Sequence, residues 1–344
     1  MNKTLKIFLL FLIVGIAIGG IGAGIAYYYM LYPQFHPKET TYIYIDENDN
    51  IDSIYNKVKT EGKPTKYEGF RWIMQYKKYE DRIRTGRYAI NPGDNAYQLY
   101  QRLAGGQQTP VNLTIGSVRT LDRLAKNVES QLMIDSVDIV TRLFDIDYIS
   151  KLGYNDETLY ALFIPNTYEV YWNISTNAFF ERMQKEYNRF WNEDRLKKAA
   201  AIGLSPTEVS TLASIVDEET NDNAEKPVVA GLYLNRLRRG IPLQADPTVK
   251  FALKDFEARR VTNSMLETDS RYNTYKYAGL PPGPIRIPSI RAIDGVLNYT
   301  RHNYLYMCAK EDFSGTHNFA TTLTEHLANA RRYHKALNDR KIFR

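Results

Sequence analysis

The sequence predicts an α+β protein with three parts: an N-terminal transmembrane helix, a small α/β module, and a larger mixed domain with long loops. Three observations support this prediction. An uncharged apolar segment lies near the N-terminus, strand, turn and helix patterns recur up to about residue 112, and the mainly helical remainder contains a turn-rich stretch. With 344 residues, 44% of them hydrophobic and 24% charged, the chain can bury a core and is expected to carry more than one domain.

The segment from Ile7 to Tyr32 contains no charged residue, and its length of roughly 25 residues matches the 17 to 25 that cross a bilayer. It is longer than the apolar core of a signal peptide, about 7 to 15 residues, and the tyrosines at its far end are typical of a membrane interface. We therefore expect an uncleaved anchor, while small residues around Gly24 and Ala26 leave cleavage as the alternative.

Charges on the two sides of this segment indicate its orientation. Lys3 and Lys6 precede it, whereas Lys38 beyond it is offset by Glu39. Because positive charge favours the cytoplasmic side, we expect a cytoplasmic N-terminus and an extracytoplasmic globular part. The expected boundaries are 1–32 for the tip and anchor, 33–41 for a linker, 42–112 for the small module and 113–344 for the larger domain.

The net charge of +6 comes from Lys and Arg scattered among acids and not from a basic block. With the predicted location, this argues against nucleic acid as a partner and favours anionic envelope surfaces. The single cysteine, Cys308, has no intrachain partner and lies in an apolar run, so we expect a small buried hydrophobe. One cysteine and five scattered histidines show no metal-ligand spacing.

The small module is predicted to alternate strands and helices. Strands are predicted at 42–45 and 86–90, and apolar residues at helical spacing predict helices at 51–58, 70–74 and 96–103. The same order recurs less cleanly at the end of the module and beyond it, with a strand at 111–115 and a helix at 121–128. The module is either a spacer that holds the rest of the chain away from the membrane or a glycan-binding module, and the sequence leaves both open.

The larger domain is predicted to be mainly helical after Thr120. The stretch 162–172 suggests a turn between short extended pieces, helices are expected at 179–191 and 206–219, and a closing helix at 323–337. Between them, 243–319 is rich in turn formers, including Ala245–Pro247 and the loop Gly279–Ile285. Long ordered loops inside a globular domain are more often functional than ornamental.

Glu219 occupies a position where a carboxylate is costly. A capping box and a first-turn proline at Ser205–Glu208 start its helix, and Glu219 continues the apolar stripe of Val209, Leu212 and Val216. Burial favours the neutral carboxyl, so its pKa should rise toward a range where it can act as an acid. The alternative is that Glu219 ends the stripe and pairs with an Arg. Of its neighbours, Asp217 falls on the helix flank, where solvent could reach it, and Glu218 on the polar side.

The loop-rich region carries a set of polar and aromatic side chains that suits a saccharide. Amides, carboxylates and hydroxyls can bond sugar hydroxyls, and aromatic faces stack on the ring. A generic polar cleft would look similar, because Asp246 could be a turn residue, Asn273 a loop cap and His317 a surface histidine. The set is Gln244, Asp246, Thr248, Tyr272, Asn273, Tyr275, His317 and Asn318.

Four ordered segments, with FIPNTYEVYW from Phe163, resemble the MltG/YceG-like endolytic murein transglycosylases. The segments are ASIVDEET from Ala213, VVAGLYLNRLRRGIPLQADPTVKFAL from Val228, YNTYKYAGLPPGPIRIPS from Tyr272 and GTHNFATTLTEH from Gly315. The similarity extends from about residue 42 to the C-terminus.

The resemblance implies a single-pass enzyme of the bacterial cytoplasmic (inner) membrane, with a LysM-like module near the membrane and an extracytoplasmic catalytic domain. Such an enzyme cleaves peptidoglycan strands internally and ends glycan strand elongation during cell-wall assembly. The implied partners are peptidoglycan strands, membrane lipid at the N-terminal span and, as candidates, cell-wall synthases. No metal, nucleotide or organic cofactor is expected.

In that family the second glutamate of the helix motif is catalytic, and it corresponds to Glu219. The polar set of the loop-rich region would bind the sugars, and Asp217 would support the site. The chain departs from the family at Asp217, where glutamate is more usual, and at Asn166, where aspartate is common. The change at Asp217 shortens a supporting carboxylate and leaves the proposed acid untouched.

The implied reaction cleaves the β-1,4 bond between N-acetylmuramic acid and N-acetylglucosamine without water. The muramic C6 hydroxyl attacks its own anomeric carbon and gives a 1,6-anhydro end, with Glu219 as the acid and then the base. Two alternatives stay open. One is a hydrolase with Glu219 as acid and Asp246 as second carboxylate; the other is a membrane-anchored glycan-binding scaffold without turnover.

Overall fold

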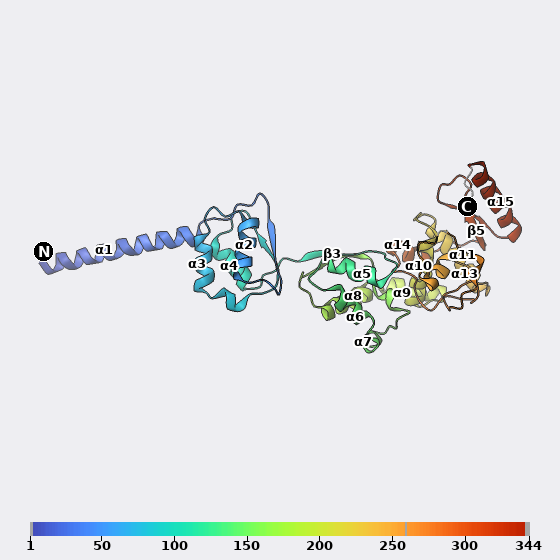
Figure 1. Cartoon of the computed structure of the whole chain (residues 1–344), viewed down its shortest axis with the longest axis horizontal. Helices are drawn as coiled ribbons and strands as arrows, with labels where there is room; N and C mark the ends of the chain where they lie inside the picture. Colours follow the sequence, from blue (N-terminus) through green and yellow to red (C-terminus); the bar gives the residue numbers. More distant parts are fainter. Residues whose placement is uncertain (1–2, 259, 341–344) are drawn as a thin grey trace. The chain divides into compact units, whose positions relative to one another are not determined.

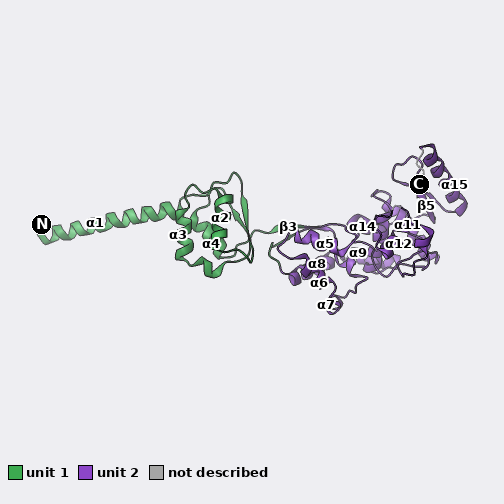
Figure 2. Cartoon of the chain, in the orientation of Figure 1, with its two compact units in different colours: residues 1–113, 169–174 green, residues 114–168, 175–344 purple. Residues whose placement is uncertain are grey.

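The computed structural model describes residues 3–258 and 260–340. The fold is mixed α+β and mainly helical, and within the described residues the strands pair into three two-stranded sheets (Figure 1). The chain forms two compact units (Figure 2). Unit 1 comprises residues 1–113 and 169–174, and unit 2 comprises residues 114–168 and 175–344.

Unit 1 begins with the apolar helix α1 (Lys3–Ala26), which continues into the π-helical turn η1 (Tyr27–Leu31). The continuous helix of 29 residues is long and apolar enough to cross a membrane, and its most apolar stretch buries nothing against the rest of the protein. The structure therefore confirms the predicted apolar helix. These properties fit a membrane anchor and a signal sequence alike.

The rest of unit 1 is a small sheet covered by short helices. Strand β1 (Thr41–Ile45) pairs antiparallel with β2 (Gly86–Ile90). Asparagine capping boxes start two of the helices, α2 (Ile51–Gly62) and α4 (Ala96–Ala104). The other two are α3 (Glu68–Tyr76) and the 3-10 turn η2 (Tyr79–Arg82). The hydrophobic core of this unit includes Ile43, Ile45, Ile54, Phe70, Tyr88 and Leu99.

Strands β3 (Val111–Ile115) and β4 (Asn166–Val170) form the second sheet. The boundary between the two units falls within both strands. The third sheet is the antiparallel hairpin of β5 (Tyr306–Ala309) and β6 (His317–Ala320) in unit 2. The strands at 41–45, 86–90 and 111–115 lie where the sequence predicts them.

Unit 2 is built around helix α10 (Pro206–Glu219), which packs with α11 (Lys226–Arg238) and α14 (Ile290–Leu297). Val209, Leu212 and Val216 of α10 lie in this core, as their spacing predicts. The remaining helices are α5 (Leu121–Glu129), α6 (Ser136–Leu143), α7 (Ile146–Lys151), η3 (Leu159–Leu162), α8 (Thr176–Phe190), α9 (Glu193–Ile202), α12 (Asp246–Leu253), α13 (Asn263–Leu266) and α15 (Leu323–Asp339).

The turn-rich stretch 243–319 contains more regular structure than its composition suggests. Helices α12, α13 and α14 and strand β5 lie within it, and β6 begins there. The turn signal at Ala245–Pro247 marks the start of α12, because proline fits the first turn of a helix, where its missing N–H leaves no bond unmade. The loop Gly279–Ile285 contains no helix or strand, as predicted.

Helix α10 is more deeply enclosed than a one-sided apolar stripe suggests. Every residue from Val209 to Asp217 is buried, including Ser210, Thr211 and Ser214. Two of these hydroxyls bond within the helix: Thr211 donates to the carbonyl of Thr207, and Ser214 to that of Thr211. The Ser210 hydroxyl is buried without a hydrogen-bond partner among the described residues. The helix that carries Glu219 is thus a central element of unit 2.

Candidate active site

A cleft of about 200 Å³ opens in unit 2 beside the C-terminal end of α10. Its walls come from α10, α11, the segment entering α12 and the β5–β6 hairpin. Three predicted substrate-binding residues lie on it together with the predicted acid. The lining residues are Glu219, Leu232, Tyr233, Arg236, Leu243, Gln244, Asp246, Met307, Cys308, Ala309 and His317.

Glu219 is the last residue of α10 and lines the cleft. The Tyr233 hydroxyl donates a hydrogen bond of 2.7 Å to Glu219 Oε1. Burial raises the pKa of the Glu219 carboxyl, and the nearby acids Asp246 and Glu218 act in the same direction. The Tyr233 bond and the charge of His317 act against the rise, and the net shift is upward. The carboxyl is therefore biased toward its protonated form.

Helix α11 contributes two groups that the sequence analysis missed, Tyr233 and Arg236. Burial raises the pKa of Tyr233 well above its ordinary value, so the hydroxyl stays a donor. Arg236 is buried and donates to the carbonyls of Leu243 (2.9 Å) and Leu305 (2.6 Å) and to Gln244 Oε1 (3.2 Å). The spacing could have indicated both, because a Tyr and an Arg three residues apart share one face of a helix.

The segment entering α12 presents Gln244 and Asp246 to the cleft. Gln244 has a positive φ of 53° and donates its backbone N–H to the Thr274 carbonyl at 3.0 Å. Asp246 Oδ1 accepts a hydrogen bond of 2.5 Å from the Tyr275 hydroxyl. Burial raises the pKa of Tyr275, and its bond to Asp246 adds to the rise. This pair joins the start of α12 to the loop that carries Tyr275, which does not itself line the cleft.

Two predicted sugar contacts lie inside the protein and fasten these loops. Asn273 is fully buried, and its Nδ2 donates to the carbonyls of Leu266 and Thr268, both at 2.8 Å. Thr248 is also fully buried and bonds the Thr274 hydroxyl at 2.8 Å. Their contacts are intramolecular, and neither residue lines the cleft.

Tyr272 and Asn318 also lie off the cleft lining. The Tyr272 ring packs against Phe251 with ring centroids 4.8 Å apart. Asn318 follows His317 on strand β6, where successive side chains point to opposite faces, and its Nδ2 donates to Glu311 Oε2 at 2.6 Å.

His317 reaches the cleft from strand β6 and is held by Glu225, which the sequence analysis did not single out. Glu225 Oε1 accepts the His317 backbone N–H at 2.7 Å, and Oε2 lies 2.8 Å from Nδ1. Both side chains are largely buried. With Nδ1 engaged, Nε2 is the ring nitrogen available to a ligand in the cleft.

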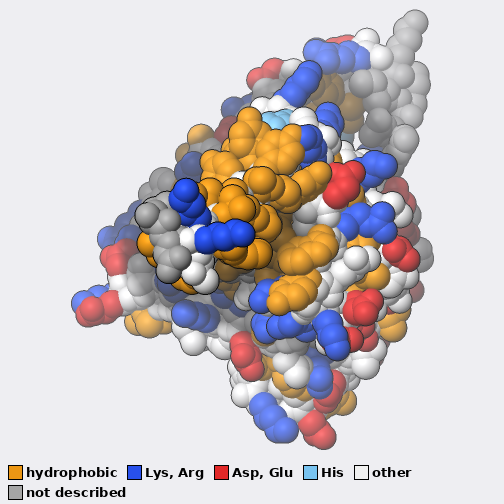
Figure 3. Space-filling view, turned by 90° about the vertical axis from the view of Figure 1, so that its left-hand side faces the viewer, with side chains coloured by type: hydrophobic (Ala, Val, Ile, Leu, Met, Phe, Trp, Pro, Cys, Tyr) orange, Lys and Arg blue, Asp and Glu red, His pale blue; other side chains and the backbone are white. Residues whose placement is uncertain are grey.

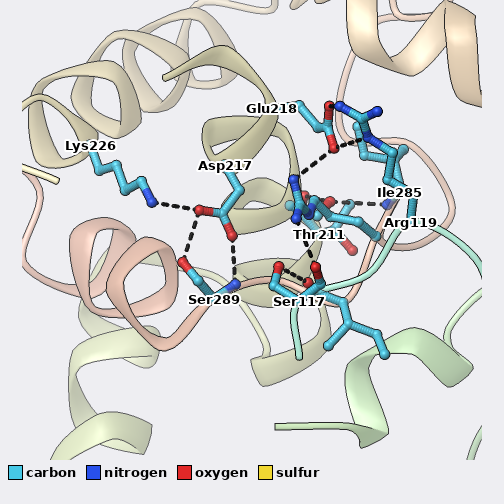
Figure 4. A network of polar contacts seen from close by, with 11 residues as sticks. Ser117, Arg119, Thr211, Asp217, Glu218, Lys226, Ile285 and Ser289 are labelled. Carbon is cyan, nitrogen blue, oxygen red and sulfur yellow. Dashed lines mark hydrogen bonds and ion pairs between the residues drawn. The ribbon is translucent and has the colours of Figure 1, made fainter. Parts of the chain in front are cut away.

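Asp217 is buried in an ion pair, which corrects the expectation of a solvated flank position (Figure 4). Its Oδ1 accepts from Lys226 Nζ at 2.7 Å and from the Ser289 hydroxyl at 2.8 Å, and Oδ2 accepts the Ser289 backbone N–H at 2.5 Å. The carboxylate therefore joins α10 to the starts of α11 and α14. Asp217 supports the end of α10 and is not one of the residues that line the cleft.

The register of Glu218 predicts a solvated position on the polar side of the helix. In the structure its carboxylate is instead bound by two arginines (Figure 4). Arg119 binds it through Nε and Nη2, both at 2.8 Å, and Arg286 Nη1 binds Oε1 at 2.8 Å. The Glu218 side chain is only 12% exposed. Asp217 and Glu218 are both bound to other segments, so the C-terminal end of α10, which carries Glu219, is held in place.

Cys308 lies on strand β5 and lines the cleft. It is half-buried, which corrects the expectation of a fully buried small hydrophobe. The reason is that β5 belongs to a two-stranded sheet, in which no residue of the strand is fully covered. Among the described residues, no group of three or more His, Cys, Asp and Glu could hold a metal ion.

The arrangement can perform proton transfer at a bound polar ligand. A carboxyl with a raised pKa faces a cleft that also holds a second carboxylate, an imidazole and an amide. Such a group can donate a proton to a leaving oxygen and then take one back. The same cleft contains the pair of carboxyl groups that an ordinary glycosidase requires, Glu219 and Asp246.

Comparisons with known proteins give consistent results. Residues 43–332 match the YceG-like family. A protein of Bacillus subtilis named endolytic murein transglycosylase is 27% identical over 328 residues, which cover 88% of this chain and 87% of that protein. Proteins of the same name from two Streptococcus pneumoniae strains are 26% identical over 343 residues, covering 88% of this chain and 61% of theirs.

A solved structure shares the fold. The 2.6 Å crystal structure of a yceG-like protein from Listeria monocytogenes aligns with a TM-score of 0.57 and 25% sequence identity. The alignment covers 85% of this chain and 99% of that one.

Proposed function

The chain belongs to the YceG-like family, and from that premise we propose that it is an endolytic murein transglycosylase acting on peptidoglycan strands. The observation that carries the proposal is the position of Glu219. Glu219 is the last residue of a central helix and lines a polar cleft, and burial raises the pKa of its carboxyl. The substrate follows from the names of the relatives, which are endolytic murein transglycosylases.

The proposed reaction needs one carboxyl and no water. Protonated Glu219 donates its proton to the glycosidic oxygen as the bond from C1 of N-acetylmuramic acid to that oxygen breaks. The C6 hydroxyl of the same sugar then bonds to C1, and its proton passes to Glu219. The products are a free 4-hydroxyl on N-acetylglucosamine and a 1,6-anhydro end. Positioned proton transfer of this kind is worth on the order of a hundred- to ten-thousandfold in rate.

The neighbours of Glu219 have distinct proposed roles. Tyr233 orients the carboxyl and stabilises its ionised form between the two proton transfers. Gln244, Asp246, Tyr275 and His317 bind the sugars and stabilise the positive charge that develops at C1. Thr248 and Asn273 act through the loops that they fasten. Tyr272 and Asn318 would contact only a glycan that extends beyond the cleft.

The remaining parts of the chain fit this activity. We propose that α1 anchors the enzyme in the bacterial cytoplasmic membrane with unit 2 on the extracytoplasmic side, and that the sheet and helices of unit 1 form a LysM-like module. Cleavage of nascent strands there would end their elongation, and cell-wall synthases are the candidate partners.

One observation favours a second function. Asp246 shares the cleft with Glu219, so a hydrolase could use Glu219 as acid and Asp246 to activate water or to attack C1. The hydrogen bond from Tyr275 restrains Asp246 and argues for a binding role. The two reactions differ in their products, because only the hydrolase adds water.

A direct test compares cleavage and binding by the full chain. Wild type, Glu219→Gln and the control Glu193→Gln, whose side chain is 83% exposed, are incubated with purified glycan strands. We expect cleavage by wild type and Glu193→Gln, and binding without cleavage by Glu219→Gln. Binding without cleavage by all three proteins would reject the enzyme and leave a glycan-binding scaffold.

A further inference from the structure

The end of the apolar helix is fastened directly to the folded part of unit 1. Buried Gln34 donates from Nε2 to the Tyr29 carbonyl at 2.6 Å, and Asn95 Nδ2 donates to the Leu31 carbonyl at 3.1 Å. These bonds satisfy carbonyls that a helix end leaves open. Gly69 of α3 lies so close that a Cβ there would be 1.9 Å from the Tyr29 carbonyl oxygen. The turn η1 therefore packs directly against α3.

Two apolar hollows of about 410 and 450 Å³ flank this junction. Trp72 of α3 lines both, and Tyr76 and Tyr97 line the second. These three rings are 55%, 66% and 39% exposed, and Trp72 stacks on Tyr76 with centroids 4.9 Å apart. Figure 3 looks at the molecule from the side of the N-terminal helix, and the hydrophobic side chains gathered near the centre of the view include the exposed ones of that helix.

The length of the apolar helix places this patch at a definite depth. From Ile7, about 20 residues at 1.5 Å each cross a hydrocarbon core of about 30 Å and reach Ala26. With α1 anchored as proposed, the turn η1 (Tyr27–Leu31) would lie in the headgroup region. Trp72 lines hollows together with Ala26 and Met30, so it lies at the same level. Trp and Tyr are enriched at this level in membrane proteins.

Positive charge borders the aromatic patch. Lys66 Nζ lies 3.8 Å from the Tyr28 ring centroid, and Lys77 Nζ lies 5.5 Å from that of Tyr76. Glu68 is the one acid that lines either hollow, and it accepts the backbone N–H of Tyr67. Lysines that extend along apolar surface can reach anionic headgroups, each contributing about 1 kcal/mol of attraction.

We propose that this patch is a membrane-docking surface, formed by Trp72, Tyr76 and Tyr97 with Lys66 and Lys77 at its rim. It would seat unit 1 in the headgroup region of an anionic bilayer, with lipid filling the two hollows. The inference rests on the proposed anchoring of α1, because continuity with an inserted helix is what brings the bilayer to this surface. The docking would fix the height of unit 1 above the membrane.

The three tryptophans of the chain, Trp72, Trp172 and Trp191, allow a direct test. The variant W172F/W191F keeps Trp72, and the matched variant W72F/W191F keeps Trp172, which also belongs to unit 1. Each full-length variant is reconstituted in vesicles of phosphatidylcholine and phosphatidylglycerol with bromine on the acyl chains near the headgroup. We expect bromine to quench Trp72 at least threefold more than Trp172; equal quenching would overturn the proposal.

The lipid charge and other occupants are tested in the same vesicles. Quenching of Trp72 should weaken when phosphatidylglycerol is omitted, and the variant K66E/K77E should lose this dependence; no effect of lipid charge would reject the anionic bilayer. Quenching that disappears as protein is concentrated in the vesicles would assign the surface to a second copy of the chain. Cleavage activity does not enter this readout, so failure of the enzymatic proposal is separately visible.

Discussion

The hydroxyl of Tyr233 on α11 donates a 2.7 Å hydrogen bond to the carboxyl of Glu219, the last residue of α10. The bond opposes the effect of burial, since it stabilises the ionised carboxylate while burial disfavours it. A carboxyl that must lose and regain a proton in one reaction benefits from both influences.

Cleavage should fall as the pH rises through the pKa of Glu219, since only the protonated carboxyl can donate to the leaving oxygen. Burial raises this pKa, so the descending limb of kcat/KM should lie above the ordinary glutamate value of about 4.3. In Tyr233→Phe the bond that lowers the pKa is lost, and the limb should move to higher pH. The profiles are compared with that of Tyr171→Phe, an exposed tyrosine; a limb shifted to lower pH would contradict the account.

Glu219→Gln should make the protein more stable at neutral pH. Because the folded-state pKa of Glu219 is raised, its contribution to stability is full at low pH and declines as the pH rises through that pKa. The neutral amide of the variant does not ionise, so the variant does not lose this stability as the pH rises. The Tm of the variant should therefore exceed that of wild type at pH 7 to 8 and approach it near pH 4. A variant that is less stable than wild type at neutral pH would be evidence against a protonated, buried carboxyl.

Asp217→Asn should lower the free energy of unfolding strongly and the rate of cleavage less. The substitution leaves Lys226 buried beside a neutral amide, and removal of one partner of a buried ion pair costs on the order of 3 kcal/mol. We expect this loss in chemical denaturation, with cleavage per folded molecule reduced less than in Glu219→Gln. Asp194→Asn, which breaks the exposed pair with Lys198, should stay within about 0.5 kcal/mol of wild type. Complete loss of cleavage in a folded Asp217→Asn would point to two essential carboxyl groups.

Glu225→Gln should weaken cleavage through His317. Glu225 binds both the backbone N–H and Nδ1 of His317, so the amide variant holds the imidazole less firmly and with less charge complementarity. We expect kcat/KM to fall about tenfold, equivalent to about 1.4 kcal/mol of transition-state stabilisation, while Glu193→Gln is unaffected. If His317→Ala loses activity and Glu225→Gln does not, the carboxylate has no positioning role.

Local signals made much of the fold predictable. The capping box at Ser205–Glu208 and the stripe of Val209, Leu212 and Val216 placed α10 and the register of Glu219, because both depend on residues close in sequence. The residues Ala245–Pro247 predict a turn, but they start helix α12, because proline is common both in turns and in the first turn of a helix.

Contacts between distant segments were not predictable from local pattern. Glu218 is clamped by Arg119, 99 positions away, and by Arg286, 68 positions away, so its place on the polar side of a single helix carried no information about them. The Tyr233 bond to Glu219 likewise depends on how α10 and α11 pack. Residue types could suggest Thr248 and Asn273 as sugar contacts, but only the tertiary structure shows that both are enclosed.

The most direct test of the central claim is a mass spectrum of the products formed from purified glycan strands in water enriched in oxygen-18. If Glu219 alone carries out both proton transfers, the new muramic ends are 1,6-anhydro sugars without oxygen-18. Reducing ends that contain the heavy isotope would contradict this account and assign the cleft to hydrolysis by Glu219 and Asp246.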